Sequence, residues 1–364
     1  GAHADTLHRS PGAVMGDNSV NRFSHGGDVY SRRIEHDFSA NINPLGIPGE
    51  VVQAASRALL ECSNYPDPCC RALAEALSRQ EVIPPERIVC GNGAADLIYR
   101  IVSALNPRCA LLCAPTFSEY EKALTEHGCA IRKHMLNRGN GFALTEGILK
   151  DIAPGTDILF LCTPNNPTGV TIPAALLRQI SGKCRESGTF LVVDECFLDF
   201  VEGGNMLSAK PLLNENSAVL KAFTKIYAMP GLRLGYAIFG SERTAARVAE
   251  SGQSWNVSVP AQAAGIAALE LDGYVEKTVG LISTERRFLS AGLRALGLEV
   301  IPSAANFILF RCDVPLDELL PKHGLMVRNC ENYDGLGKGW FRTAVRLREE
   351  NELLLAALRE VLHG

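Results

Sequence analysis

The sequence lacks long apolar runs. None approaches the roughly 18 residues that a helix needs to cross a bilayer, and the first residues, GAHADTLHRSPGAVMG, lack the apolar core of a signal peptide. We therefore expect no membrane partner and a cytoplasmic location. Residues 1–14 look like a cloning remnant ahead of a native start near Met15.

An excess of charge of one sign is also missing. The 364 residues include 21% charged side chains with a net charge of −4, so nothing in the composition predicts a nucleic acid or an anionic membrane as partner. The sequence has no internal repeat and no low-complexity linker. With 46% hydrophobic residues, a chain of this length can bury a large core and form two or three domain-sized units.

The cysteine spacing typical of metal and redox sites is absent as well. The twelve cysteines are scattered, none forms a C-x-x-C pair, and Cys113, Cys162 and Cys196 lie inside apolar runs. This pattern is typical of buried free thiols in a reducing compartment rather than of disulfides or a zinc site. We predict no metal site.

Short apolar strands alternate with helical patterns through the middle of the chain. Strands are predicted at 88–90, 109–114, 130–135, 157–162, 190–193, 219–220 and 234–239, with helices at 94–105, 119–127, 145–150 and 173–187. Such alternation favours an α/β fold whose large domain contains a mostly parallel sheet. Ligands collect at the strand ends of such sheets.

The pattern changes after Trp255. A helical region at 261–292, with breaks expected at Gly273 and Gly280, precedes predicted strands at 299–301, 306–311, 326–328 and 340–345 and helices at 316–323 and 349–362. These elements indicate a smaller α+β domain that the N-terminal residues can join. The predicted division is an N-terminal arm at 15–48, a large domain at 49–255 and a small domain at 256–364.

Lys225 lies in a small polar loop between two apolar runs, in VLKAFTKIYAMPGLRLGYAIFG (219–240). Lysine is rarely buried without a partner, and desolvation lowers its pKa and yields the neutral amine that a nucleophilic or Schiff-base lysine requires. The alternative is an exposed lysine on a hairpin loop. The rest of the chain favours the first interpretation.

Pyridoxal phosphate is the cofactor that such a lysine suggests. Its phosphate needs backbone N–H groups at a helix N-terminus together with hydroxyl or cationic donors. The small residues Gly93, Ala94 and Ala95 at a helix start fit this need, and Thr224 and Arg233 flank the lysine. As a dinucleotide fingerprint the same stretch fails, because the third glycine of GxGxxG is absent.

The cofactor ring imposes further requirements. A carboxylate must keep the pyridinium nitrogen protonated, and Asp194, at the end of an apolar strand, is a candidate, with a helix-capping aspartate as the alternative. Phe117 is a candidate stacking ring, and Asn166 is a candidate donor to the phenolic oxygen.

Several ordered motifs carry a family resemblance. The segments TPNNPTG (163–169), Asp194-Glu195, Thr224-Lys225 and PGLRLGY (230–236) resemble those of the fold-type-I pyridoxal-phosphate enzymes of the aspartate-aminotransferase superfamily. Two branches compete, histidinol-phosphate aminotransferases and the threonine-phosphate decarboxylases of cobalamin synthesis. The second matches over nearly the whole chain, including HGG (25–27), DFSANINPLG (37–46), YPDP (65–68), RNCENYDGL (328–336) and FRTAVR (341–346).

The resemblance implies roles for the cofactor-site residues. Lys225 would form the Schiff base, Asp194 would pair with the pyridinium nitrogen, Asn166 would donate to the ring oxygen and Phe117 would stack on the ring. Tyr65 would reach the phosphate across a dimer interface, which implies a homodimer.

The resemblance also implies a substrate site. Arg342 would bind the substrate carboxylate, and Arg328, His25 with Gly26, and Asn41 would line the pocket for the phosphate of a phosphorylated amino acid. Two arginines in separate strands independently suit a doubly anionic substrate, because guanidinium groups bind carboxylate and phosphate bidentately. Surface salt bridges for the arginines, and a structural role for His25, are the alternatives.

A few positions separate the branches. Phe197 and the HGG segment match the decarboxylases, whereas the aminotransferases usually have tyrosine at position 197. Ala222 replaces a phosphate-binding serine usual in the family, and REEN (348–351) is more familiar from the aminotransferases. The function predicted is decarboxylation of O-phospho-L-threonine, or a close analogue such as O-phosphoserine, to an aminoalkyl phosphate. The alternatives are a histidinol-phosphate-type aminotransferase and a non-catalytic protein that kept the fold.

Overall fold

A seven-stranded mixed sheet forms the larger part of the protein, in a computed structural model that describes residues 25–363. Among those residues, β8 is the one strand of this sheet that runs antiparallel to its neighbours. This topology confirms the predicted α/β class with a mostly parallel sheet. The strands are, in spatial order, β2 (Ile88–Gly91), β8 (Gly235–Phe239), β7 (Ser217–Ala222), β6 (Phe190–Asp194), β5 (Ile158–Cys162), β3 (Cys109–Ala114) and β4 (Ala130–Met135).

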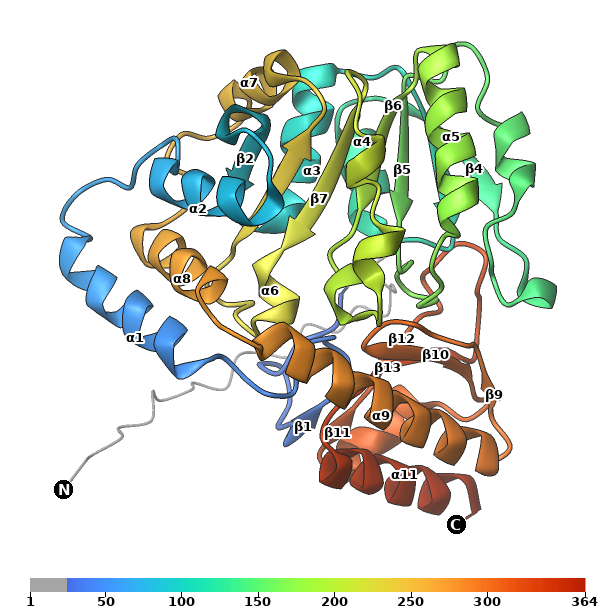
Figure 1. Ribbon diagram of the computed structural model, residues 1–364. Helices are drawn as coiled ribbons and strands as arrows, with labels where there is room; N and C mark the ends of the chain where they lie inside the picture. The colour runs from blue at the N-terminus through green and yellow to red at the C-terminus, as the bar shows by residue number, and fades with distance from the viewer. Residues whose placement is uncertain (1–24, 364) are drawn as a thin grey trace.

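Helices cover both faces of this sheet (Figure 1). α3 (Gly93–Leu105), α4 (Ser118–Glu126) and α7 (Glu242–Glu250) share one core cluster with the strands, and α5 (Ala174–Ser187) shares another. In β5, Ile158 and Phe160 face the first cluster whereas Leu159 and Leu161 face the second. Because both faces are buried, the inner strands β3, β5, β6 and β8 are nearly continuous apolar runs, which made them visible in the sequence. The edge strand β4 is partly exposed and contains Arg132 and Lys133.

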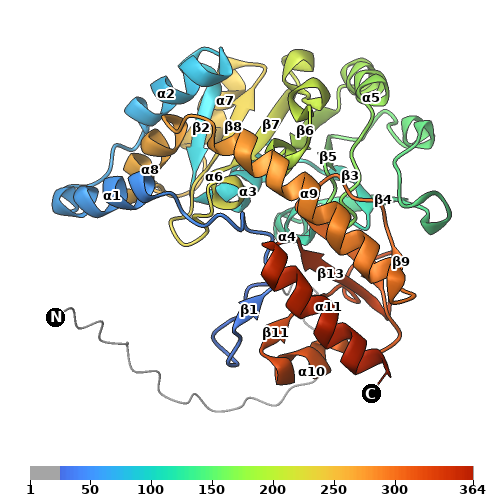
Figure 2. The ribbon, with the colours of Figure 1, turned by 60° about the horizontal axis from the view of Figure 1, so that its bottom comes forward.

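A smaller four-stranded antiparallel sheet lies beside the large one (Figure 2). The long helix α9 (Tyr274–Ala295) packs against the C-terminal helix α11 (Arg348–His363) and against strands of this sheet. The strands are, in spatial order, β12 (Arg328–Asn329), β13 (Trp340–Ala344), β10 (Phe307–Arg311) and β9 (Glu299–Val300).

The start of the described chain joins this second region. β1 (His36–Asp37) pairs in parallel with β11 (Leu325–Met326), across nearly 300 residues of sequence. The division into 15–48, 49–255 and 256–364 stays a prediction. Its residues 15–24, the start near Met15 and the remnant 1–14 lie outside the described residues.

Shorter elements complete the fold. α1 (Gly49–Ala58), α2 (Arg71–Glu81) and α8 (Val259–Leu269) pack together, and α6 (Phe223–Ile226) follows β7 directly. α10 is Leu316–Leu319, and the 3₁₀ helices are Leu59–Glu61, Pro85–Arg87, Arg138–Asn140, Glu146–Lys150, Leu198–Phe200, Gly204–Leu207, Lys210–Leu212 and Leu320–His323. Between residues 25 and 363, no helix has the length and apolarity required to span a membrane.

Three details differ from the sequence prediction or refine it. The break at Gly273 is confirmed, since this residue takes φ +67° at the N-cap of α9, but the break at Gly280 is wrong because α9 runs through it. An interior glycine costs a helix only about 1 kcal/mol, which packing offsets.

The predicted strand 326–328 is two short strands of different sheets, and the predicted helix 145–150 is a 3₁₀ helix.

Candidate active site

A cavity of about 420 Å³ opens where β5, β6 and β7 end. The last residues of these strands, Cys162, Asp194 and Ala222, form part of its wall, as expected for a ligand site in a parallel sheet. It gathers all the site residues predicted from the sequence except Gly93 and Tyr65. They are His25, Gly26, Asn41, Ala94, Ala95, Phe117, Asn166, Asp194, Thr224, Lys225, Arg233, Arg328 and Arg342.

Lys225 lines this cavity from α6, one turn of helix after the end of β7. Burial lowers the pKa of Lys225 to about 8, and the positive charges of Arg342 and Arg233 act in the same direction. A substantial fraction of the amine is therefore neutral near physiological pH. Lys225 is therefore not an exposed lysine on a hairpin loop, which was the alternative.

Asp194 is fixed by two hydrogen bonds at the end of β6. It is buried, its Oδ2 accepts from the hydroxyl of Tyr120 at 2.6 Å, and its Oδ1 accepts from the backbone N–H of Cys196 at 2.9 Å. Tyr120 stacks on Phe160 at 5.0 Å, and burial raises the pKa of its hydroxyl well above the ordinary value. A neutral phenol donor therefore holds the carboxylate in place. The sequence prediction missed Tyr120, although it follows Phe117 by one helical turn.

The N-terminus of α3 forms the candidate phosphate cradle. Gly93 takes φ +83°, and a Cβ atom there would clash with the guanidinium group of Arg233. Arg233 itself takes φ +60°, a left-handed conformation that is uncommon for a residue with a side chain. Backbone N–H groups and one cation thus meet at the same end of the cavity, with the hydroxyl residue Thr224 beside them, the donor set that a phosphate requires.

Two arginines come from neighbouring strands of the small sheet. Arg342 and Arg328 are register partners of β13 and β12, and both are buried. Arg342 donates from Nη2 to the carbonyl of Ser39 at 2.8 Å, and Arg328 donates from Nη2 to Oδ1 of Asn332 at 2.8 Å. Pairing across the sheet explains why positions 14 residues apart in the sequence bring two guanidinium groups to one cavity.

The N-terminal segment supplies the remaining wall. His25, Gly26 and Asn41 line the cavity, and His25 contacts Glu119 with 2.7 Å between Nε2 and Oε1. Sequence reasoning missed Glu119, because an acidic residue next to Tyr120 at the start of a helix gives no local sign that it faces an arginine-rich cavity.

A second part of the N-terminal segment is hydrogen-bonded to helix α6, which carries Lys225. Asn43 is buried, its backbone N–H donates to the carbonyl of Lys225 at 3.1 Å, and its Nδ2 donates to the carbonyl of Ile226 at 2.7 Å. The same Nδ2 lies 2.8 Å from Oγ1 of Thr278 in α9. This contact explains the irregular asparagine-rich stretch 37–46, because it links the lysine to the small sheet's long helix.

Tyr65 lies on the surface and does not line the cavity. It is 79% exposed and stacks on Trp255 with 4.6 Å between ring centroids. Within one chain, the structure therefore does not bring Tyr65 to the cavity.

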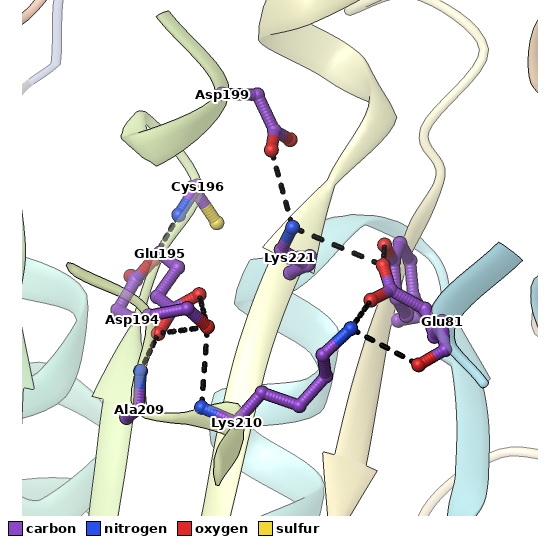
Figure 3. Close-up of polar contacts among 10 residues, drawn as sticks. Glu81, Asp194, Glu195, Cys196, Asp199, Ala209, Lys210 and Lys221 are labelled. Atoms are coloured by element: carbon purple, nitrogen blue, oxygen red, sulfur yellow. Dashed lines mark hydrogen bonds and ion pairs between the residues drawn. The ribbon is translucent and has the colours of Figure 1, made fainter. Parts of the chain in front are cut away.

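A partly buried ionic network lies along β7, the strand that leads to Lys225 (Figure 3). Lys221 of β7 contacts Asp199 at 3.1 Å and Glu81 at 3.8 Å, and Lys210 contacts Glu81 at 2.8 Å. Burial alone would lower the pKa of Lys221, but the carboxylates of Asp199 and Glu81 raise it above the ordinary value. Since successive strand residues point to opposite faces, this network anchors β7 while Ala222 faces the cavity.

Two buried polar atoms in the cavity wall are available to form hydrogen bonds with a ligand. Within residues 25–363, Nε of Arg342 and Oδ1 of Asn41 have no hydrogen-bond partner, whereas buried polar groups normally do. Together with a lysine of lowered pKa and an anion cradle, they fit an anionic aldehyde cofactor and an anionic substrate. In the same part of the chain, no group of three or more His, Cys, Asp or Glu side chains could hold a metal ion.

Known proteins resemble this chain over most of its length. Residues 34–358 match the family model Aminotransferase class I and II. The chain is 40% identical over 334 residues to threonine-phosphate decarboxylase from Salmonella typhimurium, covering 90% of this chain and 91% of that protein. It is 34% identical over 330 residues to histidinol-phosphate aminotransferase from Methanosarcina mazei, covering 87% and 86%.

The fold agrees with these matches. The crystal structure of histidinol-phosphate aminotransferase from Clostridium acetobutylicum superimposes with a TM-score of 0.84 at 28% identity, covering 90% of this chain and 99% of that chain. The predicted resemblance is thereby confirmed. The chain belongs to the class I and II aminotransferase family, has the fold type I of pyridoxal-phosphate enzymes, and uses pyridoxal 5′-phosphate as its cofactor.

Proposed function

We propose that this protein decarboxylates O-phospho-L-threonine, or a close analogue such as O-phosphoserine, to an aminoalkyl phosphate. One observation carries the proposal: the guanidinium groups of Arg328 and Arg342 face the same cavity as the depressed-pKa amine of Lys225. Two arginines match a substrate with both a carboxylate and a phosphate. The 40% identity to the Salmonella threonine-phosphate decarboxylase supports the same reaction.

Each proposed cofactor residue would contact one part of pyridoxal phosphate. Gly93, Ala94 and Ala95 at the start of α3, with Thr224 and Arg233, would hold the phosphate, and Asp194 would pair with the ring nitrogen. Phe117 would stack on the ring, and Asn166 would donate to its oxygen. When bound, pyridoxal phosphate supplies an electron sink for the bond that breaks at Cα of an amino acid.

The chain's own groups would decide which bond breaks. Arg342 would bind the substrate carboxylate, while Arg328, His25 and Asn41 would bind the phosphate. These two contacts would fix the orientation of the substrate about Cα so that the bond to the carboxylate breaks and CO₂ leaves. The ammonium form of Lys225, or a water, would then give a proton to Cα, so that hydrogen replaces the carboxylate.

We further propose a cytoplasmic homodimer in which Tyr65 of one chain completes the phosphate site of the other, with the product used in cobalamin synthesis. The exposed stack of Tyr65 on Trp255 supports an interface at this surface, because a large exposed aromatic pair is typical of a contact site. The arm 15–48, large domain 49–255 and small domain 256–364 are part of the same proposal.

The second candidate is transamination of histidinol phosphate, which the 34% identity to the Methanosarcina enzyme favours. Phe197 argues against it. Its ring lines the cavity and packs edge-on against Phe307 with centroids 4.9 Å apart. A phenylalanine cannot donate the hydrogen bond that a tyrosine at this position would give.

The test is an incubation of the cofactor-loaded enzyme with O-phospho-L-threonine, with and without 2-oxoglutarate, in which CO₂ and glutamate are both measured. The proposal predicts CO₂ without any keto acid and no glutamate. O-phospho-L-serine, run in parallel, identifies the preferred side chain. Glutamate formation instead, with histidinol phosphate as the better donor, would establish the second candidate.

A further inference from the structure

Glu119 is, with Asp194, one of the acidic side chains in the wall of an arginine-rich cavity. It lies at the start of α4, is 8% exposed, and contacts Nε2 of His25 through Oε1 at 2.7 Å. Its Oε2 accepts a hydrogen bond from the hydroxyl of Tyr99 at 3.3 Å. The hydrogen bond with His25 lowers the pKa of Glu119 against the opposing effect of burial, so the group is a carboxylate at neutral pH.

A bare carboxylate at this place would repel a doubly anionic substrate. Each of its oxygens, however, has a partner, and the partner of Oε1 is an imidazole that also lines the cavity. The imidazole is therefore held against the carboxylate at the cavity wall, and the ring of Phe117 lies beside it with ring centroids 5.7 Å apart. Because both oxygens of Glu119 have partners, its main influence on a bound anion is through the orientation of His25.

The residues after His25 have a second anchor. A Cβ atom on Gly26 would clash with the carbonyl group of Ser39, and the N–H of Gly27 donates to Oγ of Ser39 at 2.7 Å. The same Ser39 carbonyl accepts from Nη2 of Arg342 at 2.8 Å. The segment 25–27 is thus tied to Ser39 at one end and to Glu119 at the other, which joins the α4 side of the cavity to the Arg342 side.

We propose that Glu119 is a positioning residue: it fixes the orientation of the His25 imidazole and closes segment 25–27 across the cavity against the substrate's phosphate. The substrate part of this statement rests on the proposed function. Without an acceptor at position 119, the imidazole loses its hydrogen bond while the neighbouring ring of Phe117 remains, and among the described residues the segment keeps its Ser39 anchor.

The first experiment compares E119A, E119Q, H25A and the double variant H25A/E119A with the wild type. We expect E119A to raise KM for O-phospho-L-threonine about tenfold with kcat within about twofold, because binding and not chemistry depends on the contact. E119Q retains an acceptor oxygen and should restore KM to within about threefold of wild type. The double variant should be no worse than H25A, since coupled residues are not additive.

The control is E126Q, which removes an exposed carboxylate from the same helix and should leave both constants unchanged. Multiplicative effects of H25A and E119A, or a fall in kcat at constant KM, would overturn the proposal.

A second readout does not depend on the substrate. Hydrogen exchange of a peptide covering 25–31 is measured in the cofactor-loaded enzyme without substrate. Exchange should be faster in E119A and near wild type in E119Q and E126Q. Unchanged exchange in E119A would refute the role of Glu119. If the wild type releases no CO₂ but the exchange pattern is as expected, the proposed function fails while the anchoring by Glu119 stands.

Discussion

Arg342 donates from Nη1 to Oδ1 of Asn166, and the bond joins the small sheet to the loop that follows β5 of the large sheet. Both side chains are buried and both line the cavity. The guanidinium group also lies 5.5 Å from the ring centroid of Phe307, which restricts its orientation. The arginine is therefore held in place before any substrate arrives.

Replacement of Arg342 by alanine should weaken binding of the substrate by a few kcal/mol, a loss of about a hundredfold in Kd, because a buried anion loses its partner. R342K keeps the charge but cannot reproduce a planar fork, so we expect an intermediate loss. Equilibrium titration with O-phospho-L-threonine and steady-state KM measure both. R311A, on the neighbouring strand β10, is the control, and an unchanged KM in R342A would remove Arg342 from the site.

Lys225 should be the residue to which the cofactor attaches, and its amine should lose its proton at a lower pH than an ordinary lysine does. K225A should abolish the visible absorbance of covalently held pyridoxal phosphate and all turnover, whereas K150A, an exposed lysine, should change neither. Because the neutral amine reacts, the rate at which the cofactor-free enzyme takes up pyridoxal phosphate should rise with pH and level off above the pKa of about 8. A midpoint near the ordinary value of 10.5 would contradict the burial argument.

Glu195 should make the enzyme less stable as the pH rises through the weakly acidic range. Burial raises its pKa from the ordinary 4.5 to about 7, although the N–H of Ala209 and the hydroxyl of Ser208 both donate to it. Between these two pH values the folded state binds more protons than the unfolded state, so the free energy of unfolding falls with increasing pH. The full shift corresponds to about 3 kcal/mol.

The isosteric variant E195Q isolates this effect. Its free energy of unfolding in urea, minus that of the wild type, should grow from pH 4.5 to pH 7 and then stay constant. E186Q, an exposed carboxylate on α5, should show no such trend. A difference that shrinks over the same interval would show that the buried carboxylate is stabilised by its donors and by Lys221 more than it is penalised by burial.

Much of the fold could be predicted because its signals are local. β3 and β4 occur at the predicted residues, since each strand is a short run of residues bounded by turns or charged groups. Gly93 and Lys225 could be identified for a similar reason, because small residues at a helix start and an isolated lysine between apolar runs are visible within a few adjacent residues.

Other features could not be predicted because they depend on contacts between distant residues. Glu119 meets His25 across 94 positions, and Tyr120 meets Asp194 across 74. Gly280 looked like a helix break by propensity alone, yet α9 continues because its packing outweighs a single glycine.

Apolar periodicity and short motifs extend over a few residues, so the layered α/β fold, the strand ends where ligands bind and the family could all be inferred from the amino acids alone. Which charges face one another follows from the packing of distant segments: Arg328 lies beside Arg342, Lys221 lies between Asp199 and Glu81, and Glu119 contacts His25. Desolvation and pairing energies depend on the three-dimensional neighbourhood of a charge, and no short stretch of sequence encodes that neighbourhood.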